Sequence, residues 1–407
     1  MIAFLVAAKY GIQQRAYTDY RLRGLFGAMI AYLDNNSTTK PSPQVVKAVL
    51  KSLEHNWGNA SSPHGFGQTS AKLIATARDQ VAALVGVTAD QVVFTSGATE
   101  ANEAVLRHHL ANGRILITSD IEHPAVTGVY RSRAPELIRI IPVDHEGRWD
   151  LDALETQLAG PPALVAVAWA NGETGVLQNI QAISDCARNQ GAQILLDASQ
   201  AVGRIPIDDC ARGATYITLS GHKLHAPKGT GALIQINELL DPVVIQVGGE
   251  QELGLRGGTE NVPGIIGFGV ACELRRRNID GAIQHLADLR NRFETALGEK
   301  LPDIRVNGVR APRVPNTSNI TFCGVDGMAL VARLEDKGIL CSQLSACSSG
   351  SPEPSRTLTA MGLNSEQAFA SVRFAFSVDN TLAEVEFAIQ IIVAEVIYLR
   401  EILGGLI

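Results

Sequence analysis

A lysine stands where a strand-like run gives way to glycines, in the stretch LSGHKLHAPKGTG at residues 219–231. The ε-amine of this residue, Lys223, can form an imine with a carbonyl compound. The alternative is a solvated loop lysine with no chemical role, and the stretch taken alone favours that alternative. Other polar positions in the chain have to decide between the two.

Two such positions coincide with the ends of apolar runs. Asp197 ends the run at 193–197, and a carboxylate at the end of a buried strand needs a partner, because an unpaired buried charge is costly. Residues 96–99, Ser-Gly-Ala-Thr, join another apolar run to a helical pattern, where free backbone amides and the helix dipole favour a phosphate. The alternatives are a structural salt bridge between Asp197 and Lys223 and a plain N-cap by Ser96 or Thr99.

An amine, a carboxylate and a phosphate-binding turn are together what a pyridoxal phosphate (PLP) enzyme requires. Lys223 follows Asp197 by 26 residues (223 − 197), at the end of a nearby strand. The lysine would form the imine, and the carboxylate would keep the pyridinium nitrogen protonated so that the ring accepts electrons. Ser220 and His222 flank the lysine and are further candidate phosphate donors. The sequence therefore predicts PLP as the cofactor.

The elements that carry these residues alternate between strand and helix. Seven apolar runs are interleaved with helical patterns, at residues 91–95, 114–118, 137–143, 163–169, 193–197, 216–219 and 231–236. This alternation predicts an α/β fold with a mainly parallel seven-stranded sheet, covered on both faces. Ligands bind beyond the carboxyl ends of strands in such sheets, which is where the polar positions fall.

The pattern changes after residue 271. A helix near 282–300, strands at 319–322 and 371–376, a loop at 341–356 and a closing helix near 381–403 indicate a smaller α+β domain. The segment 31–33 is expected to share its sheet. We therefore expect a large PLP-binding domain at 42–271 and a small domain made of 29–41 and 272–407. Residues 1–28 are expected to be an extension outside the fold, either disordered or not native.

The composition is that of a globular protein and argues against nucleic-acid binding and membrane spanning. Hydrophobic residues make up 46% and charged residues 19%, as in globular proteins, and the net charge is −6. The chain has no long basic run, so nucleic acid is not an expected partner, and its apolar runs are too short to cross a membrane. Six cysteines lack zinc-type spacing, which predicts reduced thiols, a cytoplasmic protein and no metal site.

Nine motifs identify a family. They read YLDNNSTT at 32–39, GNASSPHGFG at 58–67, TSGATE at 95–100, EHPAV at 122–126, NGETG at 171–175, DASQAVGR at 197–204, SGHKLHAPKGTGAL at 220–233, RGGTEN at 256–261 and SACSSGSPEPS at 345–355. With them the chain resembles the PLP-dependent cysteine desulfurases of fold type I, in class V of the aminotransferases, especially the nitrogenase-type and iron–sulfur-cluster-type branch. The resemblance runs from residue 32 to the C-terminal helix. It implies conversion of L-cysteine to L-alanine, with sulfur supplied for iron–sulfur clusters or other sulfur-containing biomolecules. It also implies a homodimer and a sulfur-acceptor or scaffold protein.

The resemblance also implies a role for each cofactor residue. Lys223 corresponds to the Schiff-base lysine, Asp197 to the partner of the ring nitrogen, and Gln200 to the residue that binds the ring hydroxyl. His123, in EHPAV, is similar to the histidine that stacks on the ring and moves protons. The residues implied for the phosphate are Ala98, Thr99, Ser220 and His222, with Thr259 reaching the phosphate of the neighbouring subunit.

Two residues are implied for the substrate. Arg373, in SVRFAF, resembles the clamp for the substrate carboxylate, which a guanidinium fork fits well. Cys347 lies among small turn-forming residues, so its thiol is expected to be accessible, whereas Cys341, the competitor, is expected to end a strand. The Cys347 thiolate would attack the substrate sulfur and keep it as a persulfide, after His123 or the substrate amine takes its proton.

Two positions depart from the family pattern. Gly172 stands where a second asparagine is usual, and Asn171 is the residue that could take its place; Ser342-Gln343-Leu344 replaces the usual Ser-Ser-Gly before the cysteine. The alternatives in function are a selenocysteine lyase, or another β-eliminating class V enzyme, and a catalytically inactive scaffold for sulfur-transfer partners.

Overall fold

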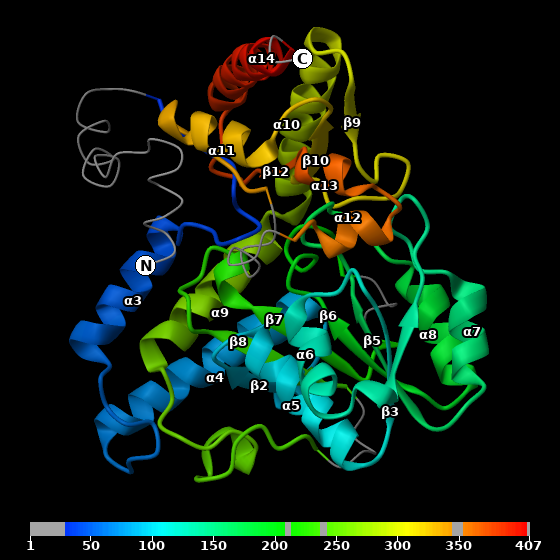
Figure 1. The fold of residues 1–407 in the computed structure, drawn as a ribbon. Helices are drawn as coiled ribbons and strands as arrows, with labels where there is room; N and C mark the ends of the chain where they lie inside the picture. The colour runs from blue at the N-terminus through cyan, green and yellow to red at the C-terminus, as the bar shows by residue number, and fades with distance from the viewer. Residues whose placement is uncertain (1–28, 208–212, 237–241, 344–352, 405–407) are drawn as a thin grey trace, which may run out of the picture.

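The computed structural model describes residues 29–207, 213–236, 242–343 and 353–404 (Figure 1). The extension at 1–28 and Cys347 lie outside the described residues.

A seven-stranded sheet forms the centre of the larger part of the described chain (Figure 1). Its order is β2-β8-β7-β6-β5-β3-β4, and only β8 runs antiparallel to its neighbours. The strands are β2 (Val92–Thr95), β3 (Ile115–Ser119), β4 (Ile138–Ile141), β5 (Ala163–Ala168), β6 (Gln193–Asp197), β7 (Tyr216–Ser220) and β8 (Gly231–Gln235). The prediction of a mainly parallel seven-stranded sheet is confirmed.

Helices cover both faces of this sheet because successive strand residues point to opposite sides. Val165 and Val167 of β5 pack in one apolar cluster, and Leu164 and Ala166 pack in another. The first cluster includes residues of α4 (Gly65–Val85), α7 (Leu151–Leu158), α8 (Ile180–Asn189) and α9 (Val262–Arg277). The second includes residues of α5 (Ala98–Ala111) and α6 (Pro124–Arg133), while α3 (Pro43–His55) packs on α9.

The smaller part has its own apolar core. Antiparallel strands β12 (Ser371–Ala375), β10 (Thr317–Phe322) and β9 (Ile304–Val306) form its sheet. In Figure 1, α10 (Ile279–Lys300), α11 (Gly327–Asp336) and α14 (Leu382–Gly404) lie with this sheet, and their apolar residues join its buried cluster. Two short helices, α12 (Arg356–Ala360) and α13 (Ser365–Phe369), precede β12. The domain boundaries stay a prediction, and α9 runs without a break across the expected division at 271/272.

The segment at 31–33 joins the smaller part in a different way from the one expected. β1 (Ala31–Tyr32) pairs in parallel with β11 (Ile339–Leu340) as a separate two-stranded sheet. It meets β12 where the Ala375 amide donates to the Leu33 carbonyl at 2.7 Å. The segment 34–39 then reaches the larger part of the chain, where the Thr39 amide donates to the His222 carbonyl at 2.9 Å.

No helix in the described ranges has the combination of length and apolar character that a bilayer span needs.

The close approach of β8 to the turn before α5 explains one glycine of the lysine motif. A Cβ placed on Gly231 would lie 2.5 Å from both the Gly97 Cα and the Leu219 carbonyl oxygen, so backbone would have to move. We predict that Gly231→Ala lowers the free energy of unfolding by about 1–3 kcal/mol through overpacking.

The matched control is Gly298→Ala in α10, where an added Cβ meets no atom within 4 Å. Helix propensity predicts that this change raises stability by about 0.5–1 kcal/mol. Chemical denaturation of both variants measures the difference, and equal stabilities would contradict the steric argument.

Candidate active site

The carboxyl ends of several strands border one cavity of about 250 Å³. Ala168, Asp197 and Ser220 are the lining residues at the ends of β5, β6 and β7, and the helix start at Ala98 follows β2. Residues of the smaller part close the cavity. A more open groove of about 660 Å³, between α5 and residues 242–247, contains none of the predicted site residues.

The fold brings together nine of the predicted site residues at this cavity. They are Ala98, Thr99, His123, Asp197, Gln200, Ser220, His222, Lys223 and Arg373. Thr259 is exposed and is not among the lining residues, and Cys347 lies outside the described residues. These residues come from five separate stretches of the chain, at 98–99, 123, 197–200, 220–223 and 373.

The Lys223 amine and the Asp197 carboxylate both make hydrogen bonds that hold them in place. Lys223 Nζ donates to the backbone carbonyls of Asn36 and, at 2.8 Å, Ser37. The Asp197 carboxylate, which is 7% exposed, accepts from Asn102 Nδ2 at 2.9 Å and from the Ser199 amide at 3.0 Å. Two donors fix the direction of a carboxylate, so Asp197 presents a defined acceptor at the cavity wall.

The start of α5 offers backbone donors next to the lysine. Its N-cap is Gly97, and neither Ser96 nor Thr99 caps the helix with its side chain, so the expected alternative of a plain N-cap by one of them is wrong. The Ala98 amide donates to Ser220 Oγ at 3.1 Å, which joins the helix start to the end of β7. An uncapped helix N-terminus that faces a polar cavity suits a phosphate.

Both histidines of the site are expected to be neutral. His123 caps α6, and its Nδ1 accepts from the Ala125 amide at 3.1 Å, so the proton of the neutral ring is on Nε2. Burial lowers the pKa of His123 below its ordinary value, although the Asp197 charge opposes the shift. Burial and then the Lys223 charge lower the pKa of His222 to about 4.

Asn171 does not take the place of the missing asparagine. Its Nδ2 donates to the Ile121 carbonyl at 2.9 Å, and its Oδ1 accepts from the Glu173 and Thr174 amides, so the amide group builds the turn itself. Gly172 lines the cavity, and a Cβ at this position would lie 3.4 Å from Gln200 Nε2. A larger residue at position 172 would therefore contact the Gln200 side chain, and the glycine leaves that contact unmade.

Gln200 has both ends of its carboxamide engaged. Its Nε2 donates to the Asn36 carbonyl at 3.0 Å, and its Oε1 accepts from Arg204 Nη1. Gln200 is thus held against the 34–39 segment while it lines the cavity.

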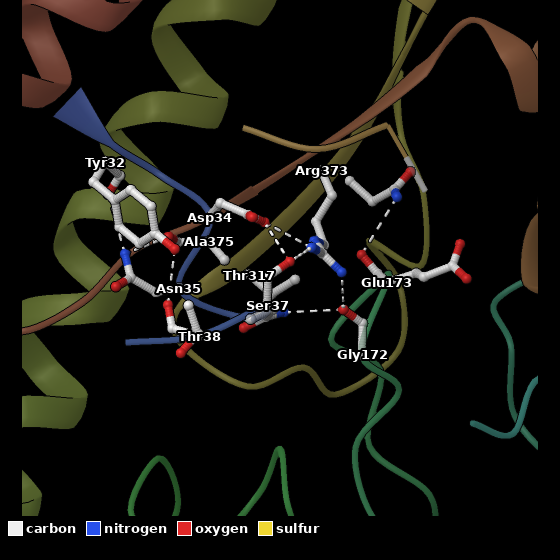
Figure 2. Close-up of polar contacts among 12 residues, drawn as sticks. Tyr32, Asp34, Asn35, Ser37, Thr38, Gly172, Glu173, Thr317, Arg373 and Ala375 are labelled. Carbon is white, nitrogen blue, oxygen red and sulfur yellow. Dashed lines mark hydrogen bonds and ion pairs between the residues drawn. The ribbon is translucent and has the colours of Figure 1, made fainter. Parts of the chain in front are cut away.

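Arg373 reaches the cavity from β12, and Figure 2 shows its guanidinium between Asp34 and Gly172. Its Nη2 donates to Asp34 Oδ1 at 2.7 Å and to Ser37 Oγ at 2.8 Å, and its Nη1 donates to the Gly172 carbonyl at 3.2 Å. The side chain is 4% exposed. The predicted carboxylate clamp is therefore at the cavity and is already paired with a carboxylate of the chain.

The residues on both sides of the segment that carries Cys347 are attached close to the cavity. Arg373 exchanges backbone hydrogen bonds with Ser342, and Gln343 Nε2 donates to the Phe369 carbonyl at 2.5 Å. On the far side, Ser355 Oγ donates to the half-buried Glu173 carboxylate at 2.5 Å. Gln343, which departs from the family pattern, therefore links the chain before this segment to the end of α13.

Cys341 does not suit the role of nucleophile. It follows β11, as expected, and burial raises the pKa of its thiol well above the usual range. A thiol that stays protonated is a poor nucleophile.

Residues of the site that sequence reasoning missed include Asn36, Asn102, Glu122 and Ser199. Asn102 was detectable as an asparagine among the apolar residues of α5, in helical register with Thr99. Glu122 accepts from Ser119 Oγ at 2.9 Å and from the Ala168 amide at 2.7 Å, and nothing in the motif EHPAV indicates these contacts. Ser199 contributes only its backbone amide to Asp197, which no pattern of side chains reveals.

Comparisons with known proteins agree with this geometry. The model of the class-V aminotransferase family matches residues 31–387. A cysteine desulfurase of Trichormus azollae is 43% identical over 368 residues, which cover 89% of this chain and 92% of the relative. A cysteine desulfurase of Gluconacetobacter diazotrophicus is 40% identical over 379 residues, which cover 91% of this chain and 94% of the relative. The X-ray structure of a NifS-like protein from Rickettsia africae superposes with a TM-score of 0.82 at 32% identity, over 90% of this chain and 99% of that one.

The raised pKa of Glu122 predicts how the free energy of unfolding depends on pH. Burial raises the pKa of Glu122 to about 8, so between its ordinary pKa and pH 8 the folded chain binds a proton that the unfolded chain has lost. The free energy of unfolding therefore falls with rising pH through this window. Glu122→Gln removes the titration, and the stability of the variant relative to the unmodified protein should rise by about 2–4 kcal/mol from pH 5 to 8.

Thermal unfolding across this pH range measures the effect. Glu136→Gln, which changes an exposed carboxylate, is the control and should keep the pH dependence of the unmodified protein. A constant stability difference between the Glu122→Gln variant and the unmodified protein would contradict a buried proton at Glu122.

Proposed function

The chain belongs to the class-V aminotransferase family, as a cysteine desulfurase, and we propose that it converts L-cysteine to L-alanine with PLP held in the cavity around Lys223. One observation carries the proposal: the Lys223 amine, the Asp197 carboxylate and the uncapped start of α5 line a single cavity.

The donor set fits PLP. The Ala98 and Thr99 amides at the start of α5, with Ser220 and His222, would hold its phosphate. Asp197 would hold the ring nitrogen, and Lys223 would bind the aldehyde carbon. When bound, the cofactor supplies an electron-accepting ring that stabilises charge at the α-carbon of an amino acid.

The Lys223 amine would move the substrate proton, and His123 would present a neutral ring at the cavity. Lys223 Nζ, now on the carbonyls of Asn36 and Ser37, would take and return the proton of the substrate α-carbon. His123 is neutral with its proton on Nε2, so its ring can pack against another ring without carrying a charge. Its lowered pKa keeps it in this form throughout the neutral pH range.

Arg373 would bind the substrate carboxylate, and Cys347 would receive the sulfur. In that transfer the Cys347 thiolate attacks the substrate sulfur, a new S–S bond forms and the substrate C–S bond breaks. The electron pair of that bond stays with the substrate carbon, which takes a proton and leaves as alanine. The raised pKa of the Cys341 thiol supports Cys347 as the nucleophile over its neighbour.

We further propose a homodimer in which Thr259 reaches the phosphate of the partner subunit, since Thr259 is exposed and outside the cavity of its own chain. The persulfide sulfur would pass to an acceptor or scaffold protein for iron–sulfur clusters or other sulfur-containing biomolecules. We also propose that the protein is cytoplasmic.

Two substitutions test the roles of the amine and the thiol. Lys223→Ala should lose the visible absorbance that borohydride abolishes in the unmodified protein, and should lower kcat at least about 100-fold. Cys347→Ser should keep this absorbance and form no persulfide, because the hydroxyl replaces the sulfur nucleophile.

The assay is purified protein with L-cysteine and a reductant, with alanine and sulfide measured in parallel. Cys341→Ser is the matched control and should retain activity. Full sulfide production by the Cys347→Ser variant would refute the role of Cys347, and an unmodified protein without a borohydride-sensitive absorbance would refute the use of PLP.

A further inference from the structure

The Arg373 guanidinium has its best carboxylate-binding nitrogen already in use. A carboxylate binds an arginine in bidentate fashion through Nη2 together with either Nε or Nη1. Here Nη2 donates to both Asp34 Oδ1 and Ser37 Oγ, which uses its two protons. Nε is buried and has no hydrogen-bond partner among the described residues. An incoming carboxylate can bind in bidentate fashion only if Nη2 releases one of these two contacts.

Asp34 lies behind the arginine and outside the cavity. It is not among the residues that line the cavity, whereas Ser37 and Arg373 are. Its Oδ1 also accepts from Ser37 Oγ at 2.9 Å, so Asp34, Ser37 and Nη2 form a closed triangle, visible in Figure 2. Ser37 is the neutral member, and its contact is the one that a carboxylate displaces at the lower cost.

The charge of Asp34 stays close to the arginine when the Ser37 contact is released. Its side chain is 18% exposed and that of Arg373 is 4% exposed, so solvent screens the pair weakly. A second carboxylate on the same guanidinium then meets an arginine whose charge is already balanced, and meets a like charge behind it.

We propose that Asp34 is a positioning residue that orients the Arg373 guanidinium and lowers its affinity for the carboxylate of the amino acid. The proposal rests on the proposed function for the identity of the substrate. Weak carboxylate binding has a use in this reaction, because the product alanine carries the same carboxylate as the substrate and has to leave. Asp34 thereby sets the affinity of the site for both amino acids.

Asp34→Asn is the test, because an asparagine keeps an oxygen that accepts from Nη2 and Ser37 but removes the charge. The KM for L-cysteine and the inhibition constant of L-alanine should each fall by about tenfold, with a smaller change in kcat. The inhibition constant of L-alanine methyl ester, which lacks the carboxylate charge, should not change. A purely structural role of Asp34 would alter the binding of the acid and the ester alike.

Two further variants keep the test decisive. Asp34→Ala removes the acceptor as well as the charge, so the fork loses its orientation and the KM should rise above that of the Asp34→Asn variant. Glu395→Gln breaks another ion pair of the smaller part, the one with Arg333 at 2.5 Å, and should leave the KM and both inhibition constants unchanged.

An unchanged or raised alanine inhibition constant in the Asp34→Asn variant, or equal shifts for alanine and its ester, would overturn the proposal. An unmodified protein that forms no alanine and sulfide from L-cysteine would contradict the proposed function instead, so the two failures are distinguishable.

Discussion

The site depends on one buried amide, that of Asn36, which is 1% exposed. Its side chain accepts from Arg204 and Asn316 and donates to Thr317 and the Gly172 carbonyl, and its own carbonyl accepts from Gln200 and Lys223. These partners come from the segments that follow β6 and β7 of the large sheet, from the turn at 171–175, and from the start of β10 in the small sheet. Because buried polar groups have to be paired, the polar groups of Asn36 tie three parts of the chain to one arrangement.

Positive charge collects around this amide. Lys223, Arg204 and Arg373 all contact the 34–37 segment, and burial followed by the charges of Arg275 and Arg373 lowers the pKa of Arg204 to about 9. Asp34 is the ion-pair partner of one of these cations, Arg373. Such a site favours ligands with a phosphate and a carboxylate, and the anions supplied by the chain itself determine how tightly each is held.

Particular elements show where sequence reasoning succeeded. The seven apolar runs became the strands of one sheet because their alternate residues bury on two helix-covered faces, as Leu164 and Val165 illustrate. Eight candidate residues met at one cavity because strand ends of a parallel sheet share an edge, and Arg373 reaches the same cavity from β12 of the small sheet. The side-chain cap expected as an alternative at Ser96 or Thr99 is absent, since the N-cap of α5 is Gly97, which has no side chain.

The sequence by itself determined the large sheet, the positions of the amine and the carboxylate at its edge, and the family, because local periodicity and short motifs are written in neighbouring residues. Only the tertiary structure decided that the Asn171 side chain bonds within its own turn. It also decided that Glu122 accepts from the Ala168 amide and that Asp34 pairs with Arg373 beside the cavity. These contacts join residues up to 339 positions apart, as between Asp34 and Arg373, and their energies depend on burial. No local pattern encodes which polar groups meet once water is excluded.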